Sequence, residues 1–251
     1  MMKRSDRRQD ILGLLRNGDA HAIVEMAEAL AVSDETIRRE LRQMETEGLI
    51  ERSHGGARLA KTAEEGAFEV RLGRNAVAKQ RIAAAVALRV EDGQSLYIDA
   101  SSTSYYVAQA LRSKRDLTIV TNALGVIQEL GGRNGNRVFT AGGELDDRYR
   151  AYFDSDARAY LARFRPSLAI ISTESVDPAA GFTNYHVREA DLCRQMIGQS
   201  ERVLIAVDAS KFGRCSVAAV ASFAEIDIVV TDGDPGQAYS ALADAVEWIV
   251  C

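Results

Sequence analysis

Cysteine is scarce in this sequence, and the three that occur, Cys193, Cys215 and Cys251, are widely spaced. An odd, scattered set fits neither a disulfide framework nor a group of zinc ligands. The three histidines share no ligand spacing either, so the sequence gives no support to a metal centre. We therefore expect the cysteines to be packing residues in a reducing compartment, and we expect no cofactor.

Long apolar runs are also lacking, since no stretch approaches the roughly 18 to 20 residues needed to span a bilayer. The basic opening MMKRSDRRQD leads directly into ILGLLRNGD and not into an apolar core of a targeting segment. With 47% hydrophobic and 27% charged residues, the composition is that of an ordinary globular protein with two domains. We expect a cytoplasmic protein that does not enter a membrane.

An excess of positive charge is the third absence, because the formal net charge at pH 7 is −5. Such a balance argues against a protein that coats nucleic acid indiscriminately, which depends on a large positive field. Residues 1–60 are themselves close to neutral, with ten Lys or Arg and eleven Asp or Glu. Any basic face must therefore arise from the positions of a few residues.

Residues 11–46 show the apolar spacing of three short helices, the last two joined by the turn AVSD. In the third helix, Ile37, Leu41 and Met44 fall on one face, which directs three arginines and Thr36 outwards. This arrangement is typical of a helix-turn-helix whose second helix enters the major groove. A solvated charged face is the alternative, and it is the commoner explanation for an isolated helix.

The continuation LIERSHGGARL favours the DNA-binding interpretation. Two short extended arms around a Gly-Gly turn match the hairpin with which a winged helix touches phosphates. Basic residues at the start, Lys3, Arg4, Arg7 and Arg8, could add further backbone contacts. The candidate DNA-contacting residues are Ser33, Thr36, Arg38, Arg39, Arg42, His54 and Arg58.

Residues 3–58 resemble the DNA-binding domain of the DeoR family of bacterial transcriptional regulators. The matching stretches are RRQDILGLL, VEMAEALAVSDETIRRELRQMETEGLI and ERSHGGARL, and Glu40 stands where the family more often has Asp. The resemblance implies a winged helix-turn-helix over residues 1–58 that binds double-stranded operator DNA. Residues 59–74 lack a sustained period and are interpreted as a linker.

Residues 75–251 alternate short apolar runs with helical segments, the pattern of a parallel α/β sheet with crossover helices. Ligands collect outside the carboxyl ends of such strands. Polar or glycine endings recur there, and no G-x-G-x-x-G follows the first strand, which predicts a small phosphorylated ligand and not a dinucleotide. Simple helix capping and solvated charge are the alternatives. The endings comprise Asp99 with Ser101 to Ser104, Thr121 with Asn122, Gly142 with Gly143, and Asp208 with Ser210 and Lys211.

This second part also resembles the DeoR sensor domain, which is related in fold to sugar-phosphate isomerases and responds to phosphorylated sugars. Three departures bear on ligand preference: Ser101 replaces a glycine, Asp154 would repel a phosphate if it faced the pocket, and STESVD (172–177) lacks two glycines. The resemblance implies effector contacts from Asp99, Ser101, Ser102, Thr103, Thr121, Asn122, Gly142, Gly143, Glu189 and Lys211.

Two function classes follow. The favoured one is a repressor of a sugar or polyol catabolic operon, working as a homo-oligomer (dimer or tetramer) because one winged domain reads only a half-site. The segments GFTNYH and VEWIVC have a faint likeness to the glycerol-3-phosphate regulon repressors of the family. The alternative is an isomerase-like enzyme acting on a sugar phosphate through Asp99, Glu174, Asp177 and Lys211.

Overall fold

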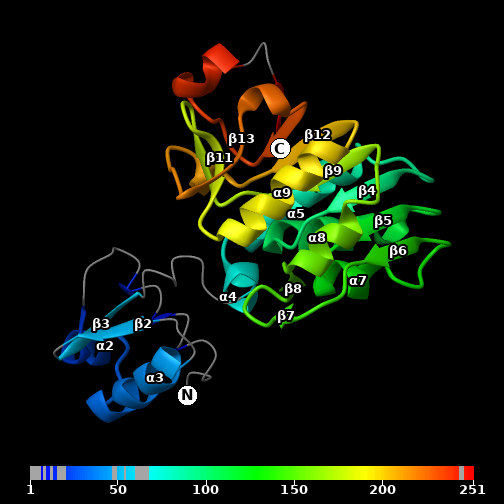
Figure 1. The fold of residues 1–251 in the computed structure, drawn as a ribbon. Coiled ribbons are helices and arrows are strands. Elements are labelled where there is room, and N and C mark those ends of the chain that lie inside the picture. Colours follow the sequence, from blue (N-terminus) through cyan, green and yellow to red (C-terminus); the bar gives the residue numbers. More distant parts are fainter. Residues whose placement is uncertain are drawn as a thin grey trace. The chain divides into compact units, whose positions relative to one another are not determined.

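The computed structural model describes residues 7, 10, 11, 14, 15, 21–46, 50–53, 55–59, 68–242 and 246–251. The chain divides into two compact units, Met1–Arg71 and Leu72–Cys251, which run from blue to cyan and from cyan to red in Figure 1. Each unit has its own buried apolar cluster. The domain limits given above, 1–58 and 75–251, stay a prediction.

The small unit contains the predicted helices α2 (Ile23–Ala29) and α3 (Asp34–Thr46) and the predicted hairpin of β2 (Ile50–Ser53) and β3 (Gly56–Leu59). Ile37, Leu41 and Met44 are fully buried, as their spacing predicts. They pack with residues of α2 and the hairpin around one core. Helix, turn, helix and wing therefore share a single hydrophobic cluster, which fixes the outward face of α3.

A third strand, β1 (His21–Ala22), pairs with β3 and was not expected from the sequence. Gly56 permits this pairing, because a Cβ added there would lie 2.3 Å from the carbonyl oxygen of His21. Gly55 has a φ of +84°, in the region that favours glycine. The Gly-Gly pair is thus required by the turn and by the close approach of β1.

The segment predicted as a linker ends in a helix, α4 (Phe68–Gly73), with Phe68 buried. Val70 packs against the core of the small unit. Six residues are too few to show a helical period in the sequence, which explains why no helix was expected there. Residues 60–67 lie outside the described part of the chain.

The large unit is built on a seven-stranded sheet in the order β15-β14-β12-β9-β4-β5-β6, and every neighbouring pair is parallel. The predicted parallel α/β fold is therefore confirmed. The strands are β4 (Ser95–Ile98), β5 (Thr118–Thr121), β6 (Arg137–Thr140), β9 (Leu168–Ile171), β12 (Arg202–Ala206), β14 (Ile228–Thr231) and β15 (Glu247–Val250).

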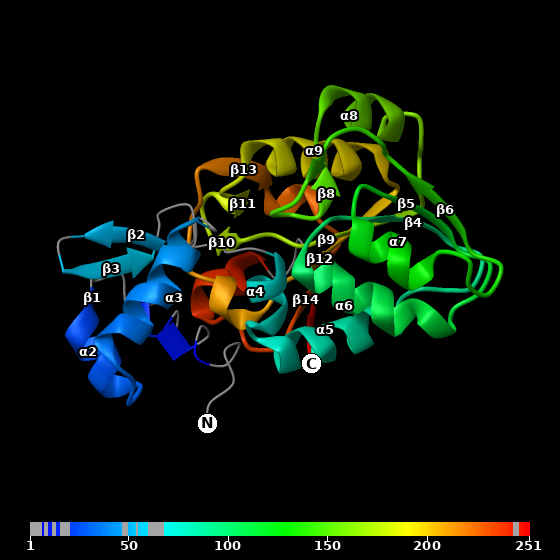
Figure 2. The same ribbon diagram turned by 90° about the horizontal axis from the view of Figure 1, so that it is seen from below.

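Helices cover both faces of this sheet, with α5, α6 and α7 on one side and α8 and α9 on the other (Figure 2). The sequence reading did not predict α5. No helix within the described residues is long and apolar enough to cross a membrane. The five helices are α5 (Ala76–Ala87), α6 (Ser102–Ala110), α7 (Leu124–Leu130), α8 (Ser155–Leu161) and α9 (Val187–Gln199).

A small antiparallel sheet in the order β10-β11-β13 accompanies the large one and was also missed. It comprises β10 (Ser175–Asp177), β11 (Gly181–Asn184) and β13 (Ala218–Ala221). A two-stranded ribbon joins β7 (Leu145–Asp146) to β8 (Ala151–Tyr152). The 3-10 helices are η3 (Leu111–Ser113), η4 (Ala209–Lys211), η5 (Phe223–Glu225) and η6 (Gln237–Leu242).

Candidate functional site

The outward face of α3 carries the arginines singled out from the sequence. Arg38, Arg39 and Arg42 are all exposed, on the side away from the buried stripe. Arg42 keeps 62% of its side chain accessible although its guanidinium lies 4.0 Å from the carboxylate of Glu35. An exposed pair at that distance is worth little, so all three guanidinium groups are accessible to a partner.

Ser33 and Thr36 form the start of the same helix. The Ser33 Oγ accepts a hydrogen bond from the Thr36 backbone N–H at 3.3 Å, and the two hydroxyl groups lie 2.9 Å apart. Ser33 is therefore the helix cap that the sequence predicts. Both hydroxyls are near the surface and fix the N-terminal end of α3, the end that a recognition helix presents to bases.

For the wing, the structure describes the pairing of the two strands β2 and β3. Arg58 lies in β3, in register with Glu51 of β2. His54, at the tip, lies outside the described residues, as do Lys3, Arg4 and Arg8. That these residues contact DNA stays a prediction.

Arg7 differs from its neighbours in the basic opening segment. Its guanidinium lies 3.7 Å from the carboxylate of Glu40, whose side chain is fully buried in α3, and only 15% of the Arg7 side chain is accessible. A buried carboxylate needs such a cation, because an unpaired buried charge is costly. This geometry favours a structural ion pair for Arg7 over the phosphate contact expected from the sequence.

In the large unit, Asp99 follows β4 and is 2% exposed. Its carboxylate accepts hydrogen bonds from the backbone N–H of Ser172 at 3.1 Å and of Ser101 at 3.4 Å, and from the Ser104 hydroxyl. Burial raises the pKa of this carboxyl, and the hydrogen bonds oppose that effect. Asp99 thus joins the ends of β4 and β9 to the start of α6.

Ser101 is the N-cap of α6, since its Oγ accepts the backbone N–H of Ser104 at 2.9 Å. The capping alternative considered for this segment therefore applies to Ser101. Its φ is −78°, so serine at the family's glycine position imposes no backbone strain.

Thr121 and Asn122 end β5 and are both buried. The Thr121 hydroxyl donates to the carbonyl oxygen of Ile98 at 2.6 Å and accepts the N–H of Ala123 at 3.1 Å. Its role is thus to fasten β5 to β4. The Asn122 Nδ2 donates to the carbonyl oxygen of Tyr152 at 3.1 Å, whereas its Oδ1 has no hydrogen-bond partner among the described residues.

Asp154 caps α8 and holds the loop after β6. Its carboxylate accepts the N–H groups of Ala157 at 2.7 Å and Glu144 at 3.0 Å, and these hydrogen bonds lower its pKa. A Cβ on Gly143, whose φ is +129°, would lie 2.0 Å from the Asp154 Oδ2. Gly143 therefore makes room for the cap, and Gly142 has open space around it.

Replacement of Asp154 by alanine should lower the free energy of unfolding by about 1 kcal/mol at pH 7, the usual cost of losing an N-cap. Because the folded-state pKa is lowered, this stabilisation is present above the unfolded value and is lost as the pH falls through the folded one. Urea unfolding of the parent and variant at pH 7 and pH 3 tests this. A difference that grows towards low pH would contradict the assignment.

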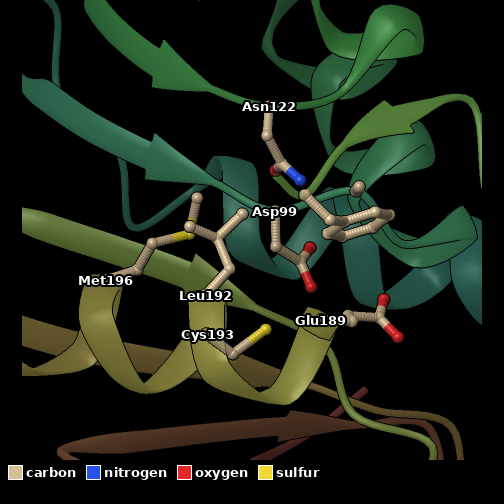
Figure 3. Close-up of a pocket in the computed structure, with 8 residues that line it drawn as sticks. Asp99, Asn122, Glu189, Leu192, Cys193 and Met196 are labelled. Atoms are coloured by element: carbon tan, nitrogen blue, oxygen red, sulfur yellow. The ribbon is translucent and has the colours of Figure 1, made fainter. Parts of the chain in front are cut away.

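A small pocket lies between the ends of β4 and β5 and the first turns of α9 (Figure 3). It brings together three predicted effector residues, Asp99, Asn122 and Glu189. Burial raises the pKa of the Cys193 thiol, and the nearby carboxylates add to that effect. The lining residues are Asp99, Ala100, Asn122, Phe153, Glu189, Leu192, Cys193 and Met196.

The other predicted effector residues lie outside the lining of this pocket. They are Ser101, Ser102, Thr103, Thr121, Gly142, Gly143 and Lys211. Asp154 does not line the pocket either. Its carboxylate instead accepts the hydrogen bonds from Ala157 and Glu144 described above. Four side chains that the sequence did not assign to the site make up much of the pocket wall: Phe153, Leu192, Cys193 and Met196.

Sequence reasoning also missed two polar residues at the start of α5. Lys79 is 4% exposed, and its Nζ donates to the Ser102 Oγ at 2.9 Å. The Asn75 Nδ2 donates to the Asp208 Oδ1 at 2.9 Å and the Ser210 Oγ at 3.1 Å. The signal for Lys79 was its helical spacing from the apolar residues 82, 83 and 86, which places a lysine on a buried face.

Comparison with known families gives two matches. Residues 7–63 match the DeoR-like helix-turn-helix domain, and residues 74–233 match the DeoR C terminal sensor domain. The chain is 32% identical over 234 residues to the glycerol-3-phosphate regulon repressor of Escherichia coli (strain K12), covering 93% of each chain. It is 29% identical to the L-fucose operon activator of the same organism, covering 90% of this chain and 94% of that one.

Two solved structures are among those to which the chain shows a distant similarity. Ribose 5-phosphate isomerase from Plasmodium falciparum has a TM-score of 0.37 at 13% identity, covering 55% of this chain and 54% of that one. A domain of a possible sugar-binding transcriptional regulator from Arthrobacter aurescens TC1 has a TM-score of 0.37 at 14% identity, covering 70% and 84%.

Proposed function

The chain belongs to the DeoR family of DNA-binding transcriptional regulators, and from that premise we propose that it represses a sugar or polyol catabolic operon under the control of a phosphorylated effector. The exposed arginine face of α3, set opposite a fully buried apolar stripe, is the observation that carries the DNA-binding part. A guanidinium reaches both base edges and phosphates in the major groove. The domain limits 1–58 and 75–251 are part of this proposal.

The effector binds along the edge where the parallel strands end. The pocket of Asp99, Asn122 and Glu189 supplies hydrogen-bonding groups within an apolar wall. The phosphate binds at the start of α6, where the Lys79 ammonium contacts Ser102 and the first N–H groups of a helix favour an anion. Asn75 anchors the loop of Asp208 and Ser210 to the same end of α5, which brings Lys211 to this side of the sheet.

The side chains that line this pocket leave no room for a water molecule, whereas ligand sites usually span roughly 300 to 1,000 Å³. Effector binding therefore requires the edge to open. If the opening changes the conformation of the sensor domain, the effector binds the open and the closed state with different affinity. Such a difference is what allows effector binding to change DNA affinity.

We assign no catalytic role to the carboxylates of the alternative enzyme. Asp99 accepts from Ser101, Ser104 and Ser172 as described, and Asp177 accepts the N–H groups of Ala179 and Ala180 at 2.9 and 2.8 Å. These hydrogen bonds order loops. A general base needs its carboxylate directed at a substrate proton, and the observed geometry gives no support to that.

We place the protein in the cytoplasm, where operator DNA lies, and expect a homo-oligomer, dimer or tetramer. Two winged domains on one pseudo-palindromic operator give the specific affinity that a single half-site cannot.

The proposal is tested on the purified full chain. Duplexes are selected from a random-sequence library, and their binding is titrated with glycerol 3-phosphate, ribitol 5-phosphate, fructose 1-phosphate and inorganic phosphate. We expect at least one organic phosphate to raise the melting temperature and to change operator affinity by about fivefold or more. Selection of no preferred sequence would overturn the regulator, and conversion of any of these compounds by the protein would favour the enzyme.

A further inference from the structure

Asn122 has a hydrogen-bond acceptor that no group within the described residues satisfies. The side chain is 1% exposed and lines the pocket. Its Nδ2 donates to the carbonyl oxygen of Tyr152, and a carbonyl can only accept, so the orientation of the amide is fixed. The remaining atom is therefore an acceptor, Oδ1, in a place where an unmade hydrogen bond is costly.

Asn184, at the end of β11, shows the opposite arrangement. Its Oδ1 accepts the backbone N–H of Glu174 at 2.9 Å, and an N–H can only donate, so the remaining atom is the donor Nδ2. This group is buried, with the side chain 1% exposed, and has no partner among the described residues. The neighbouring Thr173 is 3% exposed, and its hydroxyl also has no hydrogen-bond partner among the described residues.

Asn122 and Thr173 follow strands of the large sheet at its carboxyl edge, and Asn184, in the small sheet, contacts the residue after Thr173. Thr173 follows Ser172, whose N–H donates to the Asp99 carboxylate, and precedes Glu174, whose N–H donates to Asn184. Asn122 follows β5, which is paired with β4, and β4 is paired with β9. Asp99 therefore has Thr173 and Asn184 on its β9 side and Asn122 on its β5 side.

We propose that Asn122, Thr173 and Asn184 recognise the hydroxyl groups of the effector. A hydroxyl donates one hydrogen bond and accepts others, which matches one unsatisfied acceptor, one unsatisfied donor and one hydroxyl. The phosphate binds beside the Lys79 ammonium at the start of α6, as proposed above, so these three residues contact the hydroxyl-bearing part of the ligand. This inference rests on the proposed function and names the part of the ligand that these residues distinguish.

The test compares each polyol phosphate with the alkyl phosphate of equal chain length: glycerol 3-phosphate with propyl phosphate, ribitol 5-phosphate with pentyl phosphate, and sorbitol 6-phosphate with hexyl phosphate. Calorimetric titration of the full chain gives a preference ratio for each pair. We expect the parent to prefer the best-bound polyol phosphate by about tenfold or more, since a site built for hydroxyls rejects a ligand that lacks them.

Asn184→Asp keeps the oxygen that accepts from Glu174 and replaces the unsatisfied donor by an acceptor. The matched control is Asn136→Asp, because the Asn136 Oδ1 accepts the N–H of Leu117 and its Nδ2 is likewise unpartnered among the described residues, but it precedes β6 at the opposite edge. The added charge acts alike on the phosphate that both members of a pair carry, so this part of its effect cancels in the ratio. Asn184→Asp should reduce the ratio by about tenfold, and Asn136→Asp should leave it unchanged.

Thr173→Val, an uncharged and nearly isosteric change, gives a second reading if Asn184→Asp does not fold, and it should also reduce the ratio. An unchanged ratio in folded Thr173→Val and Asn184→Asp, with polyol phosphates still bound, would overturn this inference and leave the proposed function standing. A parent that binds no polyol phosphate would instead overturn the effector part of the proposed function, and this inference with it.

Discussion

Replacement of Arg38, Arg39 and Arg42 together by alanine should lower the affinity for the selected operator by about 100-fold or more while the protein stays folded. Each base-reading arginine is worth about 1 to 3 kcal/mol, and each phosphate contact adds to the salt dependence of binding. The fold is expected to survive because the three side chains are exposed and the buried stripe of α3 is untouched.

Fluorescence anisotropy with the operator duplex, at several salt concentrations, measures this effect. Single variants then separate two roles: loss of a base contact relaxes sequence preference, and loss of a phosphate contact weakens all duplexes alike. Alanine at Lys114, Arg115 and Arg133 of the large unit removes the same charge and serves as the control. Equal weakening by both triple variants would assign the effect to net charge and not to α3.

The face of α3 could be predicted from the sequence because a helix repeats every 3.6 residues. Three apolar residues at helical spacing define an inner stripe, and the outward position of the arginines follows without any tertiary information. Arg7 could not be placed in the same way. Its partner Glu40 is buried through the packing of α3, which no local pattern of residues 1–10 contains.

The position of polar residues at the carboxyl ends of the parallel strands could also be predicted from the sequence. Parallel strands bring their carboxyl ends to one side, so Asp99 and Asn122 were expected together, and the family resemblance added the α9 residue Glu189; all three line one pocket. The contact of Asn75 with Asp208 joins residues that lie 133 positions apart. Such pairs depend on the packing of α5 against the ends of the strands, and composition or spacing does not encode them.

The small antiparallel sheet shows a different limit. Its strands are three or four residues long, and β11 pairs with β13, which follows it in sequence only after α9 and β12. Period-two alternation is unreadable over so few residues. Asn184 lies in this sheet, and for that reason its unsatisfied donor could be recognised only after the strand had been placed next to the loop of Thr173 and Glu174.

Lys79→Met should lower the affinity for the effector identified by the titrations by about 10- to 100-fold, because a hydrogen bond to a charged group is worth about 1.5 to 3 kcal/mol. Operator binding in the absence of effector should be unchanged, since α5 belongs to the large unit and carries none of the predicted DNA-contacting residues. Methionine has nearly the length of lysine and no charge to bury, so the variant is expected to fold with little loss of stability.

Calorimetry with the effector and anisotropy with the operator separate the two functions in one variant. Lys114→Met is the matched control, because that lysine precedes β5 at the opposite edge of the sheet. If the phosphate binds beside Lys79, the Lys79 variant should lose affinity equally for a polyol phosphate and for its alkyl counterpart, whereas the Asn184 variant changes their ratio. An effector affinity that is the same in Lys79→Met, Lys114→Met and the parent would remove the phosphate from the start of α6 and require a different cation, with Lys211 the next to be replaced.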